Sequence, residues 1–109
     1  MEYIPELRAT IRRLHRCDAS HTRTEEVKQV LDGRLLWEGK VEVFALLGHD
    51  NALRCYAWGN LDGQGRWEVT TVLAIPPIVS AETAVLAAIA AKIKELEQEG
   101  GRPMPDEPA

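Results

Sequence analysis

The chain contains little cysteine and no long apolar run, and each absence excludes a class of protein. Two of its 109 residues are cysteines, Cys17 and Cys55, whereas small secreted folds usually contain several disulfide-forming cysteines. We therefore expect both thiols to be reduced. No stretch approaches the roughly 20 apolar residues that span a bilayer, and the first residues do not resemble a signal peptide. These features predict a cytoplasmic location and no membrane partner.

An excess of basic charge is also absent. The net charge is −4, residues 1–54 are electrically balanced, and the excess of acid lies in residues 55–109. A duplex-binding domain normally carries a strongly basic surface, so the charge argues against nucleic acid as a partner. The sequence contains no P-loop, no G-x-G-x-x-G and no G-x-S-x-G motif, and we expect no cofactor.

The residues that are present predict a single α+β domain over residues 1–99, with a helix at each end. Ile4, Leu7, Ile11 and Leu14 recur at helical spacing within a predicted helix over residues 5–17. Ser80 is a typical helix N-cap, and the apolar residues of the helix that follows are Val85, Leu86, Ile89, Ile93 and Leu96. Residues 100–109 are polar and proline-rich, which predicts a disordered tail.

Between these helices, β-rich runs over 34–47, 52–59 and 66–75 predict three strands, separated by turn residues. The first run is longer than most strands, and Gly39 within it is the expected position of a bulge.

Residues 22–31 allow two interpretations. Thr24 suits the start of a short helix that Gly33 ends. Alternatively, Asp32-Gly33 is a two-residue turn that joins two strands. We favour the hairpin, because it places Glu25 opposite Lys40. The predicted fold is then helix, four-stranded antiparallel meander, helix (αββββα), with both helices packed on one face of the sheet.

The alternation of side chains along the strands predicts two different faces. Val41, Val43 and Cys55 belong to a nearly continuous apolar face, which we assign to the core. The opposite face carries aromatic side chains beside arginine, a combination that interface centres favour. We therefore predict a non-enzymatic protein-binding or self-associating module, a homodimer, whose interface residues are Phe44, Arg54, Tyr56, Trp58 and Arg66.

The aromatic face has three alternative interpretations. In the first, the N-terminal helix covers part of it. In the second, its side chains shield one another from solvent. In the third, the face stacks the bases of single-stranded nucleic acid, because aromatic and arginine side chains are typical of such surfaces.

A further hypothesis is a small enzyme or a metal-binding protein. His15, Cys17 and His21 form an H-x-C-x3-H cluster, and His49 and Cys55 provide two more candidate ligands. Zinc prefers nitrogen and sulfur ligands, but the spacing matches no standard zinc motif and no C-x-x-C pair is present. A nucleophile needs a base within reach, and Cys55 is assigned to the core. We therefore predict no metal and no catalytic residue.

Several strings in the sequence are similar to a family of small bacterial proteins of unassigned function. They are W-E-G-K-V-E-V-F, G-H, C-Y-A-W, V-L-A-I-P-P and the alanine-rich helix that follows Ser80. The resemblance covers residues from about Leu7 to Leu96. It implies a bacterial origin, and it assigns no activity and no catalytic residue.

Overall fold

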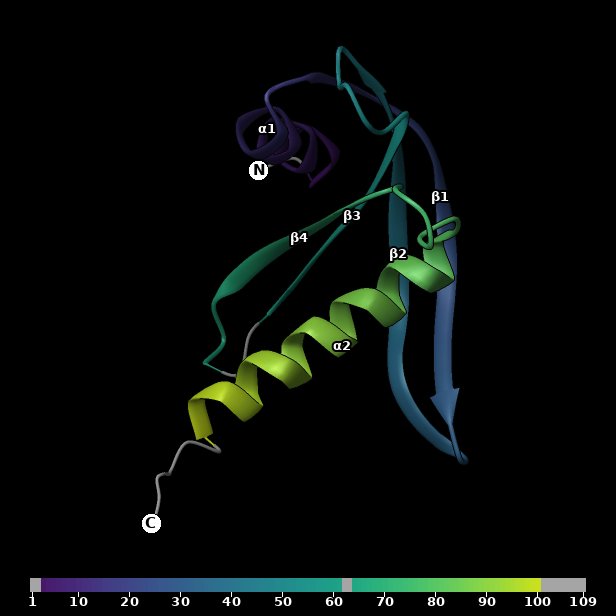
Figure 1. Ribbon diagram of the computed structural model, residues 1–109, viewed down its shortest axis with the longest axis vertical. Helices are drawn as coiled ribbons and strands as arrows, with labels where there is room; N and C mark the ends of the chain where they lie inside the picture. The colour runs from purple at the N-terminus through teal and green to yellow at the C-terminus, as the bar shows by residue number, and fades with distance from the viewer. Residues whose placement is uncertain (1–2, 62–63, 101–109) are drawn as a thin grey trace.

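The computed structural model describes residues 3–61 and 64–100, which form two helices and a four-stranded sheet (Figure 1). The sheet order is β1-β2-β3-β4, and each neighbouring pair is antiparallel. This arrangement confirms the αββββα meander. No helix in the described part of the chain is long and apolar enough to cross a membrane. The elements are α1 (Tyr3–His15), β1 (Asp18–Leu31), β2 (Arg34–Leu47), β3 (Arg54–Leu61), β4 (Trp67–Leu73) and α2 (Ala81–Gly100).

The hairpin between β1 and β2 confirms the strand interpretation of the ambiguous segment. Asp32 and Gly33 both have positive φ, at 52° and 78°, which is typical of a two-residue hairpin turn. The predicted pair of Glu25 with Lys40 is wrong, because Glu26 lies opposite Lys40. A bulge near the turn adds one residue to β2 and shifts the register by one position.

The start of α2 confirms the predicted N-cap. The hydroxyl of Ser80 accepts a hydrogen bond from the backbone N–H of Thr83 at 3.2 Å. The hydroxyl of Thr83 accepts one in return from the N–H of Ser80 at 2.9 Å. These two bonds satisfy donors that the helix itself leaves free. Gly100 ends α2, and the rest of the predicted disordered tail lies outside the described residues.

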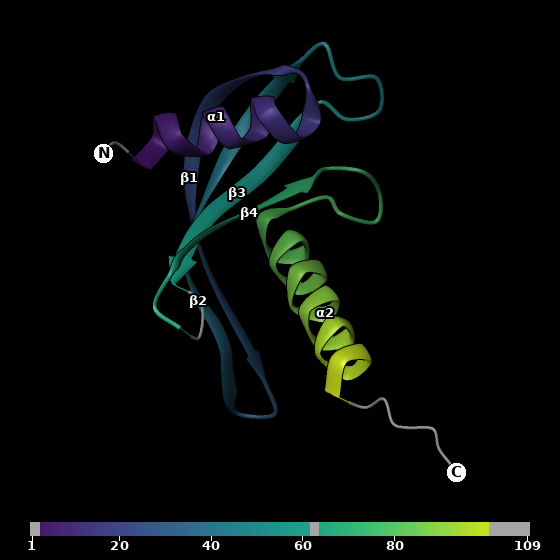
Figure 2. The same cartoon turned by 90° about the vertical axis from the view of Figure 1, so that its left-hand side faces the viewer.

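The two helices pack on opposite faces of the sheet, so the prediction of one shared face is wrong. α1 buries Leu7 and Ile11 in a cluster that includes Phe44, Leu46, Cys55 and Ala57. α2 buries Ala81, Ala84 and Val85 in a second cluster with Val41, Val43, Tyr56 and Trp58. Figure 2 shows α1 crossing the upper part of the sheet and α2 running along its lower part.

The register between β2 and β3 explains this difference. Val43 pairs with Tyr56, and Phe44 pairs with Cys55. Residues paired across antiparallel strands share a face, so Tyr56 belongs with Val43. The predicted faces joined Val43 to Cys55, one residue away from the true register. Because a one-residue slip moves every side chain of a strand to the other face, the slip mixed the two clusters.

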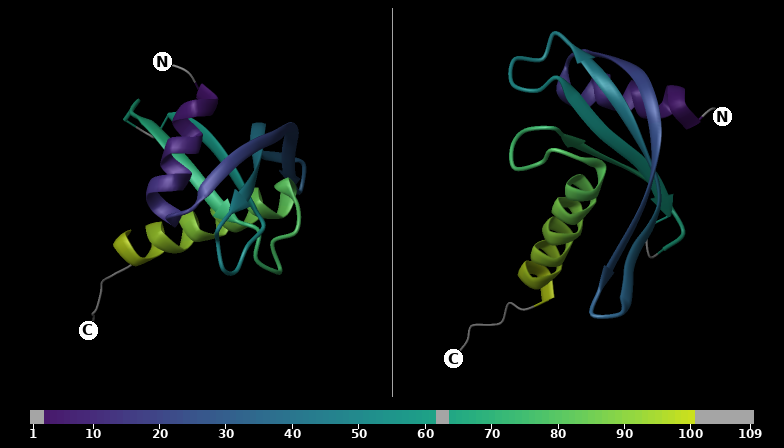
Figure 3. Two further views of the ribbon diagram at one scale, coloured as in Figure 1. Left: turned by 90° about the horizontal axis from the view of Figure 1, so that it is seen from above. Right: turned by 90° about the vertical axis from the view of Figure 1, so that its right-hand side faces the viewer.

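α2 is packed against the sheet at its start, and its side chains become more exposed toward its C-terminal end. Its first turns are fully buried at Ala81, Ala84 and Val85. Farther along, Ile93 is 52% exposed and Leu96 is 55% exposed. Both α2 and the β1–β2 hairpin point downward in the right-hand view of Figure 3, and Figure 1 shows them diverging toward their far ends. The apolar residues of this half of α2 therefore have little of the sheet to pack against.

Candidate functional site

The aromatic residues of the predicted interface belong to the core. Phe44, Tyr56 and Trp58 have relative exposures of 0%, 1% and 3%, so the expectation that they form an exposed face is wrong. The α1 cluster contains Phe44, and the α2 cluster contains Tyr56 and Trp58. Each face of the sheet is covered by a helix, which is why neither face leaves them in solvent. The stacking surface required for single-stranded nucleic acid is lost for the same reason.

The two arginines of the predicted interface are exposed but lie apart. Arg54 begins β3, and Arg66 directly precedes β4. Because β3 and β4 are antiparallel, the beginnings of the two strands lie at opposite ends of the hairpin. The structure therefore does not bring the five predicted interface residues into one exposed patch.

The histidine and cysteine candidates are divided between separate environments. His15 Nε2 lies 2.9 Å from Thr71 Oγ1, and the His15 ring meets that of His49 edge to face at 6.4 Å. Burial lowers the pKa of His15, and His49 lowers it further. His21 instead contacts Glu42. Within residues 3–61 and 64–100, no three His, Cys, Asp or Glu side chains are grouped to hold a metal ion.

Cys55 is unsuited to act as a nucleophile. Its side chain is fully buried in the α1 cluster, and burial raises its pKa to about 12. The thiolate is the reactive form of cysteine, and it is scarce at neutral pH when the pKa is this high. Cys17 is partly buried, and both residues are free thiols, as expected.

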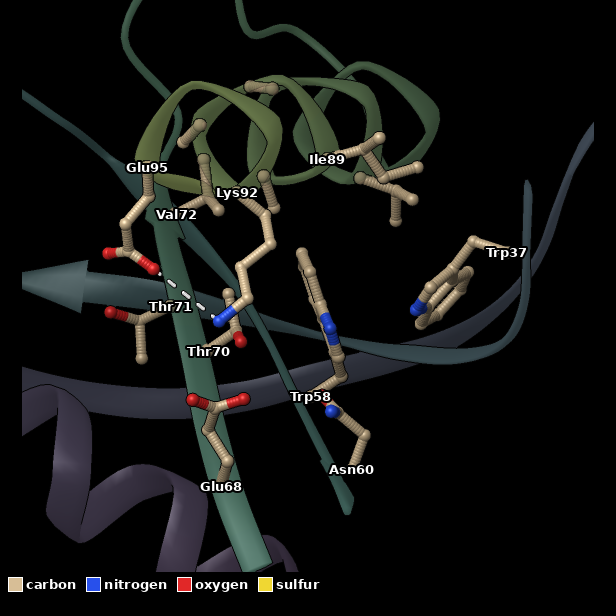
Figure 4. A pocket seen from close by; sticks show the side chains of 14 residues that line it. Trp37, Trp58, Asn60, Glu68, Thr70, Thr71, Val72, Ile89, Lys92 and Glu95 are labelled. Atoms are coloured by element: carbon tan, nitrogen blue, oxygen red, sulfur yellow. Dashed lines mark hydrogen bonds and ion pairs between the residues drawn. The ribbon is translucent and has the colours of Figure 1, made fainter. Parts of the chain in front are cut away.

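A groove of about 540 Å³ lies between α2 and the sheet (Figure 4). Trp58 points from β3 toward α2, with Trp37 on one side and the Lys92–Glu95 ion pair on the other. The rings of Trp37 and Trp58 are 5.6 Å apart and meet edge to face. Val72 and Ile89 add apolar surface. The sequence analysis did not predict Trp37 as a site residue. Its position in the same strand as the core residues Val41 and Val43 could have indicated that it belongs with them.

Exposed apolar residues also lie along α2 and at the tip of the β1–β2 hairpin. The α2 stripe comprises Leu86, Ile89, Ile93 and Leu96, which repeat at intervals of three, four and three residues. Leu86 is 44% exposed, and Ile89 lines the groove. The hairpin tip comprises four apolar residues that are between 42% and 58% exposed: Val30, Leu31, Leu35 and Leu36. The spacing in the α2 stripe is typical of a helix that packs against another helix.

A second pocket, of about 640 Å³, lies on the α1 side of the sheet. It contains Glu42, the one buried charged residue among those that the structure describes, at 4% exposure. His21 Nε2 lies 2.8 Å from Glu42 Oε1, and the hydroxyl of Thr24 donates to the same oxygen at 2.5 Å. The pairing of β1 with β2 positions both side chains beside Glu42.

Tyr3 forms one wall of this pocket. Its hydroxyl accepts a hydrogen bond from the backbone N–H of Gly59 at 2.9 Å, and its ring meets Trp67 edge to face at 5.9 Å. Burial raises the pKa of Tyr3, and the nearby negative charge of Glu42 raises it further. Tyr3 is therefore a neutral phenol at physiological pH. No local sequence signal marks this site, because its residues come from α1, β1, β2 and β3.

Comparison with protein-family models, with curated proteins and with solved structures found no match to this chain. The resemblance to a small bacterial family therefore stays a prediction, and the candidate sites rest on the geometry of the chain itself.

Proposed function

We propose that the protein is a self-associating module that forms a homodimer through the α2 stripe. The observation that carries this proposal is the exposure of Leu86, Ile93 and Leu96 on one side of a helix whose first turns are fully buried. Monomeric proteins rarely expose contiguous apolar patches, and such patches typically mark interaction surfaces.

A second copy is the occupant that the spacing and charge of α2 favour. The stripe follows the a and d positions of a heptad, with Leu86 and Ile93 at a, and Ile89 and Leu96 at d. Two such stripes pack against each other as knobs into holes. A two-fold dimer uses the same patch on both copies, so the apolar surface of each stripe is covered by its equivalent.

The charges that flank the stripe support a parallel orientation of the two helices. Lys92 occupies the g position, and Glu97, five residues later, occupies the following e position. In a parallel pair, Lys92 of one copy faces Glu97 of the other, and this contact occurs twice. Within one copy, Lys92 contacts the exposed carboxylate of Glu95 at 3.4 Å, and its ammonium group remains accessible.

The test is the oligomeric state of an Ile93→Glu, Leu96→Glu double variant, measured by sedimentation velocity over a range of concentrations. We expect the wild type to be a dimer and the variant to be a folded monomer, because both side chains are already exposed in a single copy. A Leu47→Glu, Leu53→Glu variant is the matched control, since it replaces two exposed leucines at the β2–β3 loop.

Two results would contradict the proposal. One is a wild-type protein that stays monomeric at high micromolar concentration. The other is equal dissociation of the dimer by the control variant. Orientation is tested separately: Lys92→Glu should weaken a parallel dimer, and adding Glu97→Lys should restore it by exchanging the two charges across the interface.

A further inference from the structure

The carboxylate of Glu42 is only partly satisfied by its neighbours. A carboxylate accepts hydrogen bonds on two oxygens, and a buried charge is costly unless it is compensated. The bonds from His21 and Thr24 both end on Oε1. Oε2 receives no hydrogen bond from any described residue. A buried carboxyl oxygen is thus left without a hydrogen bond from the described residues.

Glu42 lines the pocket on the α1 side, so a ligand in the pocket has access to this carboxylate. An ionised carboxylate only accepts hydrogen bonds, so the matching group of a ligand is a hydrogen-bond donor. A positively charged donor makes the strongest such bond. The lining contains the carboxylates Glu38 and Glu42 and the ammonium of Lys40. Two carboxylates against one ammonium favour a cationic ligand.

The walls of the pocket suit an organic cation better than a metal ion. Tyr3 lines it, and aromatic rings attract ammonium and guanidinium groups. Asn60 adds a side-chain amide to the lining. Metal ions of the calcium or magnesium type need several oxygen ligands, and the described residues contain no group of three acidic, histidine or cysteine ligands.

We propose that this pocket binds a small organic cation, a primary ammonium or guanidinium compound, whose N–H group donates to Glu42 Oε2. His21 and Thr24 act as positioning residues, because their bonds to Oε1 hold the carboxylate in one orientation. Glu42 lies on the opposite face of the sheet from the α2 stripe, although Trp37 and Asn60 line both the pocket and the groove beside α2.

The test is a titration of the wild-type protein with n-butylammonium and n-butylguanidinium, followed by the backbone amide resonances of Gly39, Gly59 and Asn60. We expect saturable shifts with both cations, and none with n-butanol or butyrate at the same concentrations. The side-chain carboxyl carbon of Glu42, observed in glutamate-labelled wild-type protein, should shift in the same titrations. That second measurement needs no variant and stays informative if the substitution below disturbs folding.

A Glu42→Gln variant keeps the size of the side chain and removes its charge. We expect it to bind both cations at least about tenfold more weakly, as expected for loss of a charge-assisted contact. Glu25→Gln is the matched control, because Glu25 is a β1 carboxylate paired with Arg23 outside this pocket. Equal binding of n-butanol, unsaturated shifts up to about 10 mM cation, or an equal loss in the control would overturn the proposal.

Discussion

α1 and α2 cover opposite faces of one sheet, but they bury different fractions of their apolar side chains. In α1, Leu7 and Ile11 are fully buried by the sheet beneath them. In α2, Val85 is fully buried, whereas Ile93 and Leu96 remain more than half exposed. α2 has 20 residues and α1 has 13, so α2 carries apolar residues beyond the surface available to it. α1 also leaves Leu14 52% exposed, but α2 exposes a row of large apolar residues, Leu86, Ile93 and Leu96, and this row indicates the side available for a partner.

The two sides also differ in chemistry. The α1 side contains a buried carboxylate with a polar pocket around it, while the groove on the α2 side is walled by Trp37, Trp58 and Ile89. The first suits a small charged ligand, and the second suits an apolar macromolecular surface.

Truncation of one leucine on each helix should affect stability very differently. Leu7→Ala should lower the free energy of unfolding by about 2–5 kcal/mol, because it leaves a cavity in a packed core. Leu96→Ala should change the unfolding free energy of the monomer by no more than about 0.5 kcal/mol, as for most surface positions. Urea denaturation at protein concentrations low enough to give monomer measures both. Similar losses would show that α2 is packed as completely as α1.

Thiol reactivity tests whether α1 keeps Cys55 inaccessible to solvent and reagent. A rise in the pKa of Cys55 from 9.0 to about 12 lowers its thiolate fraction near neutral pH about a thousandfold. In a Cys17→Ser variant, we expect Ellman's reagent at pH 8 to leave Cys55 unmodified over minutes. Modification should be rapid once the protein is unfolded in denaturant. Rapid reaction of the folded protein would mean that the α1 cluster opens readily.

A smaller effect is expected at the buried start of α2. Ser80→Ala removes the acceptor for the Thr83 N–H and should cost about 1 kcal/mol of stability, the usual value for an N-cap. Ser20→Ala, at an exposed strand position, is the control and should cost less. Urea denaturation followed by circular dichroism distinguishes them. Equal costs would argue that the cap does not anchor α2.

The smallest effect is expected where α1 joins β1. The pKa of Asp18 is lowered from 3.8 by the backbone N–H of Ala19 and then by the guanidinium of Arg8. A lowered folded-state pKa contributes stability above pH 3.8 that is lost as the pH falls through the folded value. Asp18→Asn should therefore lower the melting temperature slightly at pH 7 and progressively less below pH 3.8. The side chains are exposed, so screening keeps the effect small.

Asp50→Asn, in the exposed β2–β3 loop, provides the comparison for the melting experiment. If Asp18→Asn lowers the melting temperature equally at pH 7 and below pH 3.8, the carboxylate charge does not stabilise this junction.

Local features of the sequence predicted most of the secondary structure. The Asp32-Gly33 turn and the Ser80 cap act over a few residues, so their signals do not depend on the rest of the chain. The predicted bulge at Gly39 is absent, because Gly39 pairs regularly with Val27 and the irregularities lie elsewhere in the β1–β2 hairpin. The bulge near the turn has no clear marker in the sequence, which is why Glu25 was matched to the wrong partner.

The candidate sites were harder to predict, because they depend on which side chains of neighbouring strands point to the same face of the sheet. Both faces of β2 and β3 are apolar, so alternation alone does not distinguish one register from its neighbour. Phe44, Tyr56 and Trp58 looked like surface residues only under the wrong register. Glu42 and His21 meet through the pairing of β1 with β2, at 21 residues apart in the chain.

Periodicity and turn chemistry were sufficient for the order of the helices and strands, because both are properties of neighbouring residues. Tertiary structure decided that the helices take opposite faces, that the aromatic residues form two cores, and that the α2 stripe stays exposed. The physical reason is that strand register, and the length of a helix relative to the sheet beneath it, depend on contacts between distant segments. Those contacts exist only once the chain has folded.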